Sequence, residues 1–234
     1  MQINKTWKNR IGRYVFFCMG LFVMAFGVAF SIKADLGTSP ISSVPYVISL
    51  FAPLTVGNIT ILMHCVFIAI QILILRRRYQ PVQLMQLPVA VIFGYMTDFA
   101  IWATNGIPEG AYWERWVICV IGIVLVAFGV SMEVTANAVT LAGEGVVLAV
   151  CKVLPIKFGN MKVIFDVSLV ATACILSLGF LHNLEGVREG TVAAAILVGL
   201  LSKRFNRLLA MGLEKHRKRK DQGQVDGRSA FSHS

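Results

Sequence analysis

Charged residues are scarce in this chain of 234 residues. They make up 15% of it, whereas hydrophobic residues make up 56% and the mean hydropathy is +0.71. Soluble domains carry about 25% charged residues, so the composition excludes an ordinary soluble domain. It also excludes disorder over most of the length, because disordered segments contain few apolar residues. This composition is typical of an integral membrane protein.

The sequence also lacks the motifs of the common enzyme classes. It contains no G-x-x-x-x-G-K-[ST], no H-E-x-x-H, no G-x-S-x-G and no G-x-G-x-x-G pattern. The five cysteines form no C-x-x-C pair, and two of the four histidines, His216 and His233, lie near the end of the chain. We therefore predict that the chain is not an enzyme and holds no disulfide, metal or cofactor.

Basic residues outnumber acidic ones, but they lie in the wrong place for a nucleic-acid interface. The net charge is +10, and nine of the 22 Lys and Arg residues follow Leu201, outside the apolar body. A basic tail beside a membrane domain sets topology and attracts anionic lipids. We expect a helical extension followed by disorder there, with the lipid bilayer, anionic lipids and a second copy of the chain as partners, and no nucleic acid.

Apolar runs define the expected helices. A hydrocarbon core about 30 Å thick requires about 20 residues of apolar helix. Two runs, Pro40–Leu54 and Leu141–Ile156, are apolar but short and interrupted by Pro or Gly. Six runs are long enough to span: Tyr14–Ile32, Gly57–Leu75, Leu84–Thr104, Trp116–Val134, Phe158–Phe180 and Gly190–Leu209. The fold class is therefore an all-α polytopic membrane protein.

The chain matches itself at a shift of 102 residues. The sequence AFGV at Ala25–Val28 recurs at Ala127–Val130, and the Gly-Asn pair at Gly57–Asn58 recurs at Gly159–Asn160. Each half then reads as a long, a short and two long helices. This pattern predicts two repeats of about 100 residues, each with three spanning helices and one short, re-entrant or broken helix.

Positive charge favours one topology over another. If the short helices re-enter, both termini and Arg76–Arg78 are cytoplasmic and the two repeats are inverted. If all eight segments cross, Arg76–Arg78 lie outside and the repeats are parallel. We favour the first arrangement, in a bacterial cytoplasmic membrane, and the second stays open. The expected domains are 1–13, a basic cytoplasmic N-terminus; 14–104, the first membrane repeat; 105–115, an extracytoplasmic loop; 116–209, the second membrane repeat; and 210–234, a basic, mostly disordered cytoplasmic tail.

One element resembles a known family. The stretch AFGVAFSIKADLGTSPISSVPYVIS is similar to bacterial membrane proteins grouped as YczE/YyaS/YitT, and AFGVSMEVTANAVTLAGEGVVLAV looks like a second copy. The second copy departs from the first, because Ala142 replaces the proline. The resemblance implies a polytopic bacterial membrane protein and assigns neither a substrate nor binding residues to it.

The breaks at the short helices are the best candidate sites. A broken helix leaves backbone N–H or C=O groups unpaired, which is tolerated at membrane depth only inside protein or beside a water-filled cavity. The alternative is that the polar residues at the breaks serve only as helix caps. The candidate solute-binding residues near the breaks are Asp35, Thr38, Ser39, Ser42, Asn137, Thr140 and Glu144. Glu133 and Glu144 flank the second break, and Glu144 lies between two glycines.

Ionisable residues inside predicted spans form a second class, because each is costly to insert into a membrane. Asp98 lies near one end of its run and is a further candidate for solute binding. His64 and Asp166 occupy equivalent places in the two repeats and are candidates for a proton or ion relay. The alternative for His64 is a hydrogen bond that packs helices.

These features favour a small-solute secondary transporter or channel with a central site between two repeats. The alternative is a non-transporting accessory protein that partners another membrane protein. A transporter requires the polar residues of both breaks to surround one cavity, whereas an accessory protein can scatter them and present an apolar groove. The identity and charge of the solute, the coupling ion and the oligomeric state stay open.

Overall fold

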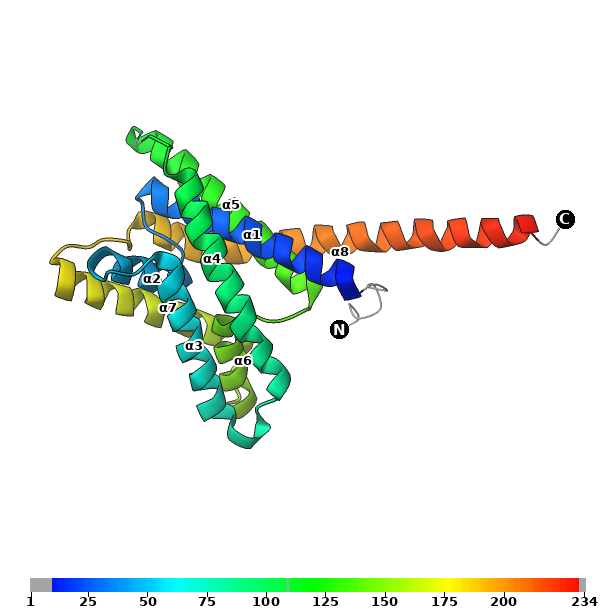
Figure 1. Cartoon of the computed structure of the whole chain (residues 1–234), viewed down its shortest axis with the longest axis horizontal. Coiled ribbons are helices and arrows are strands. Elements are labelled where there is room, and N and C mark those ends of the chain that lie inside the picture. Colours follow the sequence, from blue (N-terminus) through cyan, green and yellow to red (C-terminus); the bar gives the residue numbers. More distant parts are fainter. Residues whose placement is uncertain (1–9, 109, 232–234) are drawn as a thin grey trace.

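The computed structural model describes residues 10–108 and 110–231, which are helical apart from short connections (Figure 1). The order long, short, long, long occurs twice along the chain. The bounds are α1 Arg10–Ala34, α2 Pro40–Phe51, α3 Val56–Leu75, α4 Gln86–Thr104, α5 Tyr112–Ala136, α6 Ala142–Val153, α7 Phe158–Leu176 and α8 Glu189–Phe231. Every apolar run expected from the sequence is a helix, so the all-α class is confirmed.

Within the described ranges, five helical segments are long and apolar enough to cross a membrane. They are Gly12–Ala34, Val56–Arg78, Pro81–Thr104, Tyr112–Ala136 and Phe158–Leu181. The sixth predicted span, Gly190–Leu209, opens α8 but acquires positive charge from Lys203 onward. These helices give the chain the character of a multi-pass membrane protein.

Helix α8 extends far beyond the other helices (Figure 1). It continues to Phe231, whereas the sequence predicts a helical extension followed by disorder over most of 210–234. The part of α8 after Leu209 is rich in Lys and Arg, which favour helix, and it contains no proline, although it also contains Gly212, Gly223 and Gly227. Most of the basic N-terminus and the last three residues of the tail, residues 1–9 and 232–234, lie outside the described part of the chain.

Local sequence explains several helix ends. Asp35 and Asn137 follow the last residues of α1 and α5 and have positive φ angles of 52° and 48°. Short polar side chains tolerate this left-handed conformation, which ends the helix. Pro40 begins α2, a position where its missing N–H costs nothing. At the start of α3, the Thr55 hydroxyl accepts a hydrogen bond from the backbone N–H of Asn58 at 3.1 Å.

Helices α1 and α5 form the central contact of the molecule and run antiparallel. Glycines allow the two backbones to touch. A Cβ atom added at Gly27 would lie 2.8 Å from the Gly122 carbonyl oxygen, and one added at Gly129 would lie 2.6 Å from that of Gly20. Small residues permit this kind of close approach between membrane helices.

The last two helices of each half pack differently. Helix α4 lies along α3, and a Cβ atom at Gly94 would lie 2.7 Å from the Gly57 carbonyl oxygen. Helix α8 packs on α5 and makes little contact with α7. Gly159, which corresponds to Gly57 at the 102-residue shift, faces open space. The first half is therefore closed between its last two helices, and the second half is open.

Candidate functional site

The N-terminal ends of the two short helices touch at one place inside the molecule, whereas each helix packs mainly on α3 and α7. The Ile41 side chain of α2 lies over Gly143 of α6, where an added Cβ would be 2.5 Å from Ile41 Cδ1. Val44 and Val146, one turn further along each helix, belong to one buried apolar cluster with Phe67 and Phe165. The C-terminal ends of both short helices are exposed. Phe51 at the end of α2 and Leu54 after it are exposed, as are Val153 at the end of α6 and Leu154 after it.

The loop before α2 is held by the start of α8 and by α5. The Asp35 carboxylate accepts a hydrogen bond from Arg115 Nη1 at 3.0 Å, and Arg188 Nη1 donates to the Asp35 carbonyl at 3.0 Å. Backbone bonds join Leu36 to Gly190 and Thr38 to residue 186. Asp35 therefore anchors this loop, and its side chain is 45% exposed.

The loop before α6 is held in a matching way by α1. Arg13 donates a hydrogen bond to the carbonyl oxygen of Asn137, and the Asn137 side chain is exposed. Arg13 and Arg115 are 102 residues apart, as are Asp35 and Asn137. Each half of the chain thus supplies the arginine that holds the loop of the other half.

Hydroxyl groups surround the start of α2. Ser39 Oγ donates to Ser42 Oγ at 3.0 Å, and Ser43 Oγ donates to the carbonyl of Pro40 at 2.8 Å. Thr38 is 1% exposed, and its hydroxyl has no hydrogen-bond partner. These side chains offer both donors and acceptors at the inner end of the helix.

Carboxylates surround the start of α6. Glu133 is 3% exposed, and its Oε1 accepts the backbone N–H of Leu141 at 2.9 Å, while its Oε2 has no partner. Glu144, in the first turn of α6, interacts electrostatically with Glu133 and with Lys162 and Asp166 of α7. A buried carboxylate oxygen without a partner is an acceptor for a proton or another hydrogen-bond donor. Glu133 was singled out by its place at the break but was missing from the predicted site residues.

Asp98 has its partners outside this centre, whereas Asp166, which interacts electrostatically with Glu144, pairs with a lysine of its own helix. Asp98 of α4 caps the start of α3: it accepts the Thr55 hydroxyl at 2.6 Å and the Gly57 N–H at 2.7 Å. Asp166 pairs with Lys162 at 2.5 Å, one helical turn away.

His64 is 1% exposed, and its Nδ1 lies 2.9 Å from the Thr60 carbonyl. This hydrogen bond stays within α3 and does not join two helices, whereas the ring makes edge contacts with Phe67 of α3 and Phe93 of α4. Its Nε2 has no hydrogen-bond partner.

A polar pocket of about 160 Å³ lies between the α3–α4 connection and α6. Gln83, Gln86, Thr140 and Lys152 contribute its polar wall. Gln71 stands behind it, 0% exposed, and donates to Gln86 Oε1 at 3.0 Å and to the Ala142 carbonyl at 3.1 Å. Thr140 was predicted as a site residue, but the glutamines were missed. Their signal is visible in the sequence, since Gln71 lies in a mostly apolar run and Gln80, Gln83 and Gln86 recur at a spacing of three.

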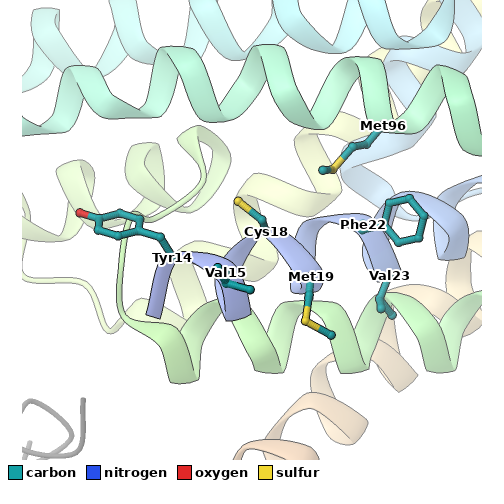
Figure 2. Close-up of a pocket in the computed structure, with 7 residues that line it drawn as sticks. All are labelled: Tyr14, Val15, Cys18, Met19, Phe22, Val23 and Met96. Carbon is teal, nitrogen blue, oxygen red and sulfur yellow. The ribbon is translucent and has the colours of Figure 1, made fainter. Parts of the chain in front are cut away.

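An apolar groove of about 580 Å³ runs along α1 (Figure 2). Figure 2 shows α1 side chains along its length, with Met96 of α4 facing them. The residues that line it are Tyr14, Val15, Cys18, Met19, Phe22, Val23 and Met96. The polar residues of the two breaks thus do not share one cavity: Thr140 lines the polar pocket, Asp35 and Asn137 hold loops, and Ser39, Ser42 and Glu144 lie at the inner ends of the short helices.

A comparison with protein families identifies the chain. A family of unknown function, DUF6198, matches residues 11–207, which include all eight helices up to the middle of α8. The chain belongs to this family. No curated protein and no solved structure matches the DUF6198 chain.

Proposed function

We propose that this DUF6198 chain is a small-solute secondary transporter or channel of the bacterial cytoplasmic membrane. In this proposal both termini are cytoplasmic, the chain is not an enzyme, and its short helices are re-entrant. The kinship with YczE/YyaS/YitT proteins that the ADLGTSP element suggests is part of the same proposal. The observation that carries it is the meeting of the N-terminal ends of α2 and α6 inside the molecule.

Paired contacts support two inverted repeats. Gly20 touches Gly129 and Gly27 touches Gly122, and a shift of 102 residues exchanges these two pairs. The same shift relates the bond from Arg115 to the Asp35 carboxylate and the bond from Arg13 to the Asn137 carbonyl. Because α1 and α5 are antiparallel, an axis that relates them lies across the helices, in the plane of a membrane. Inverted repeats around such an axis are typical of transporter folds, with the solute site near the axis.

The chemistry of the two inner helix ends favours a polar solute. A helix N-terminus carries about half a positive charge, and its first N–H groups are free to bind acceptors. At α2, Pro40 has no N–H and the N–H groups of Ser42 and Ser43 donate to the Ser39 carbonyl, so the hydroxyls of Ser39 and Ser42 are the main polar groups there. At α6 the helix start stands beside Glu133 and Glu144. The solute would bind hydroxyls on one side of the site and carboxylates on the other.

Cysteine accessibility tests whether water reaches this centre. In a variant without the five native cysteines, Ser42→Cys is expected to react with small charged methanethiosulfonate reagents in intact membranes. Ser31→Cys is the matched control, because Ser31 is 4% exposed and its Oγ lies against the α1–α5 glycine contact. If neither cysteine reacts, or both react equally, the central site is wrong.

Glu144→Gln then tests the charge of the site. Loss of the carboxylate is expected to raise the rate of an anionic reagent relative to a cationic one at Ser42→Cys several-fold, because a nearby charge sets the local potential. Glu114→Gln is the control, since Glu114 caps the exposed start of α5. An unchanged ratio in Glu144→Gln would remove this residue from the site.

Topology reporters test the inverted arrangement. Fusions after Arg78 and after Lys220 should both read cytoplasmic, since the basic segments favour that side. A periplasmic signal after Arg78 would place all eight segments across the membrane and contradict inverted repeats.

Two observations favour the second candidate function, an accessory protein: the described polar residues of the two breaks do not line one pocket, and an apolar groove runs along α1. A groove of about 580 Å³ without polar lining fits an apolar helix of another membrane protein. A photo-crosslinking amino acid at Met19 distinguishes a partner protein from lipid on this face of α1 (Figure 2). One discrete protein adduct would support the accessory function, whereas adducts with lipid alone would support a face that only contacts the bilayer.

A further inference from the structure

Lys152 and Thr140 bring two unpaired polar groups to the pocket between α6 and the α3–α4 connection. Both residues line it. Within the described part of the chain, the Lys152 ammonium forms no ion pair or hydrogen bond, and the Thr140 hydroxyl forms no hydrogen bond. An ammonium has three donors and no acceptor. The pocket therefore holds a cationic donor and a hydroxyl that are available to a ligand.

A third donor, Gln86 Nε2 of α4, is oriented by the buried Gln71. Gln71 Nε2 donates to Gln86 Oε1 at 3.0 Å and to the Ala142 carbonyl at 3.1 Å. Because both partners are acceptors, the Gln71 carboxamide cannot be turned over without placing its own oxygen against theirs. Gln86 therefore accepts with Oε1. Its Nε2 retains accessible surface and has no partner among the described residues, so it is left as a donor at the pocket.

The surroundings of these donors favour a negative charge. Among the described residues, no Asp or Glu lines the pocket, and the unpaired Oε1 of Gln83 is buried, so it does not contact a ligand. Arg76–Arg78 lie between the lining residues Leu75 and Gln80 in the chain, are exposed and have no ion pair in the described structure. Clustered charges of one sign raise the local concentration of the opposite ion. Together with Lys152, these arginines attract an anion to the pocket.

The pocket lies where α3 leaves the apolar part of the molecule. Leu75 is buried at the end of α3, the three arginines follow it, and Val82 in the pocket lining is 77% exposed. An apolar helix that ends in basic residues marks the surface of a bilayer. Basic pockets between membrane helices bind lipid head groups there. The volume of about 160 Å³ admits a phosphate group and lies below the roughly 300–1,000 Å³ of sites for drug-sized ligands.

We propose that this pocket binds a phosphate group, carried by an anionic lipid or present as free phosphate. Lys152 supplies the opposite charge, and the Thr140 hydroxyl and Gln86 Nε2 donate to the phosphate oxygens. These donors come from three segments of the chain, which suits a tetrahedral group whose oxygens accept from several directions. Gln71 is a positioning residue, because it sets the orientation of Gln86 without lining the pocket. The inference goes beyond the proposed function, since binding is expected whether or not the protein transports a solute.

Two probes on the full chain distinguish the source of the phosphate. Native mass spectrometry in detergent measures binding of phosphatidylglycerol, with phosphatidylcholine as the comparison, and calorimetry in phosphatidylcholine nanodiscs measures binding of inorganic phosphate. Tighter binding of phosphatidylglycerol than of phosphatidylcholine identifies a lipid head group, and binding of inorganic phosphate identifies the free ion. If neither is observed, the proposal is wrong.

Lys152→Met locates the binding, because it removes the charge and keeps the length of an exposed side chain. The probe that binds the native chain is expected to bind this variant at least tenfold more weakly, since charge-assisted hydrogen bonds are the strong ones. Lys157→Met is the matched control: Lys157 is exposed and close in the chain but does not line the pocket, so at most a twofold change is expected. Equal losses in the two variants would show attraction by the overall positive charge and would contradict the site.

Gln86→Glu tests the donor. One carboxylate oxygen can still accept from Gln71 Nε2, but the other replaces the donor and brings a negative charge to the pocket, so binding is expected to fall at least tenfold. Asn160→Asp adds the same charge at an exposed residue outside the pocket, and at most a twofold change is expected. Unchanged binding in Gln86→Glu would contradict the assignment. If this variant does not fold, the comparison of Lys152→Met with Lys157→Met decides the proposal alone.

Discussion

The two halves of the chain share one order of helices but close differently. In the first half, Gly57 and Gly94 let α3 and α4 touch, and Asp98 of α4 caps the start of α3. In the second half, Gly159 faces open space and Leu200, which corresponds to Asp98, is 55% exposed. Accordingly, 39% of the most apolar 18-residue stretch of the α3 span is buried, whereas only 22% of the corresponding stretch of the α7 span is buried.

The difference shows that two halves with the same order of helices can pack their helices differently. A glycine promotes close approach only where a partner backbone meets it. Gly57 has such a partner and Gly159 has none, although both precede an asparagine at a helix start. The flank of α7 is consequently left for lipid or for another chain.

The largest effect is expected from alanine at Gly57, with alanine at Gly159 as the comparison. An added Cβ at Gly57 would overlap the Gly94 carbonyl oxygen, so Gly57→Ala should destabilise the fold by about 3 kcal/mol and lower the melting temperature in detergent by roughly 10 °C. Gly159→Ala should be neutral or slightly stabilising, because alanine favours helix and has room there. Equal melting shifts in the two variants would contradict the open second half.

A smaller loss is expected at the α4 cap. Asp98→Ala removes the acceptor of the Thr55 hydroxyl and the Gly57 N–H, at a cost of about 2 kcal/mol in the free energy of unfolding. Leu200→Ala is the corresponding change in the second half and should stay within about 0.5 kcal/mol, since the side chain is largely exposed. Thermal unfolding of both variants in the same detergent measures the difference.

The loops before α2 and α6 allow a weaker test. A double-mutant cycle with Asp35→Asn and Arg115→Gln should give a coupling of about 0.5–1 kcal/mol that falls with salt, because the two side chains are 45% and 29% exposed. Arg13→Gln should show little salt dependence, because its partner is the uncharged carbonyl of Asn137. A salt effect of equal size in both halves would show that the two loops are held by the same interaction.

The smallest effect is expected from the end of α8, which has no counterpart in α4. Deletion of residues 222–234 should leave membrane insertion and the melting temperature unchanged, since the sequence there is polar and its described part, 222–231, projects beyond the other helices (Figure 1). A loss of several degrees would mean that this segment packs on the rest of the chain.

The apolar helices and their order could be predicted because each follows from local hydropathy and from residues such as Pro40 and Asp35, which act on their own backbone. The meeting of Ile41 with Gly143 could not, because the ends of a short apolar helix look alike in sequence. Gln71 was overlooked for a related reason: a single amide in an apolar run shows its role only when Gln86 and Ala142 lie beside it.

The glycine contact between α1 and α5 also imposes a delay during synthesis, because α1 is made well before its partner α5. Ribosomes add about 5–20 residues each second, and Gly122 and Gly129 follow Gly20 and Gly27 by about a hundred residues. The glycine face of α1 must therefore wait roughly 5–20 s in the bilayer before its partner emerges. During that interval α1 depends on lipid, on the insertion machinery or on α4, and the nascent chain reaches its native core only when the second half arrives.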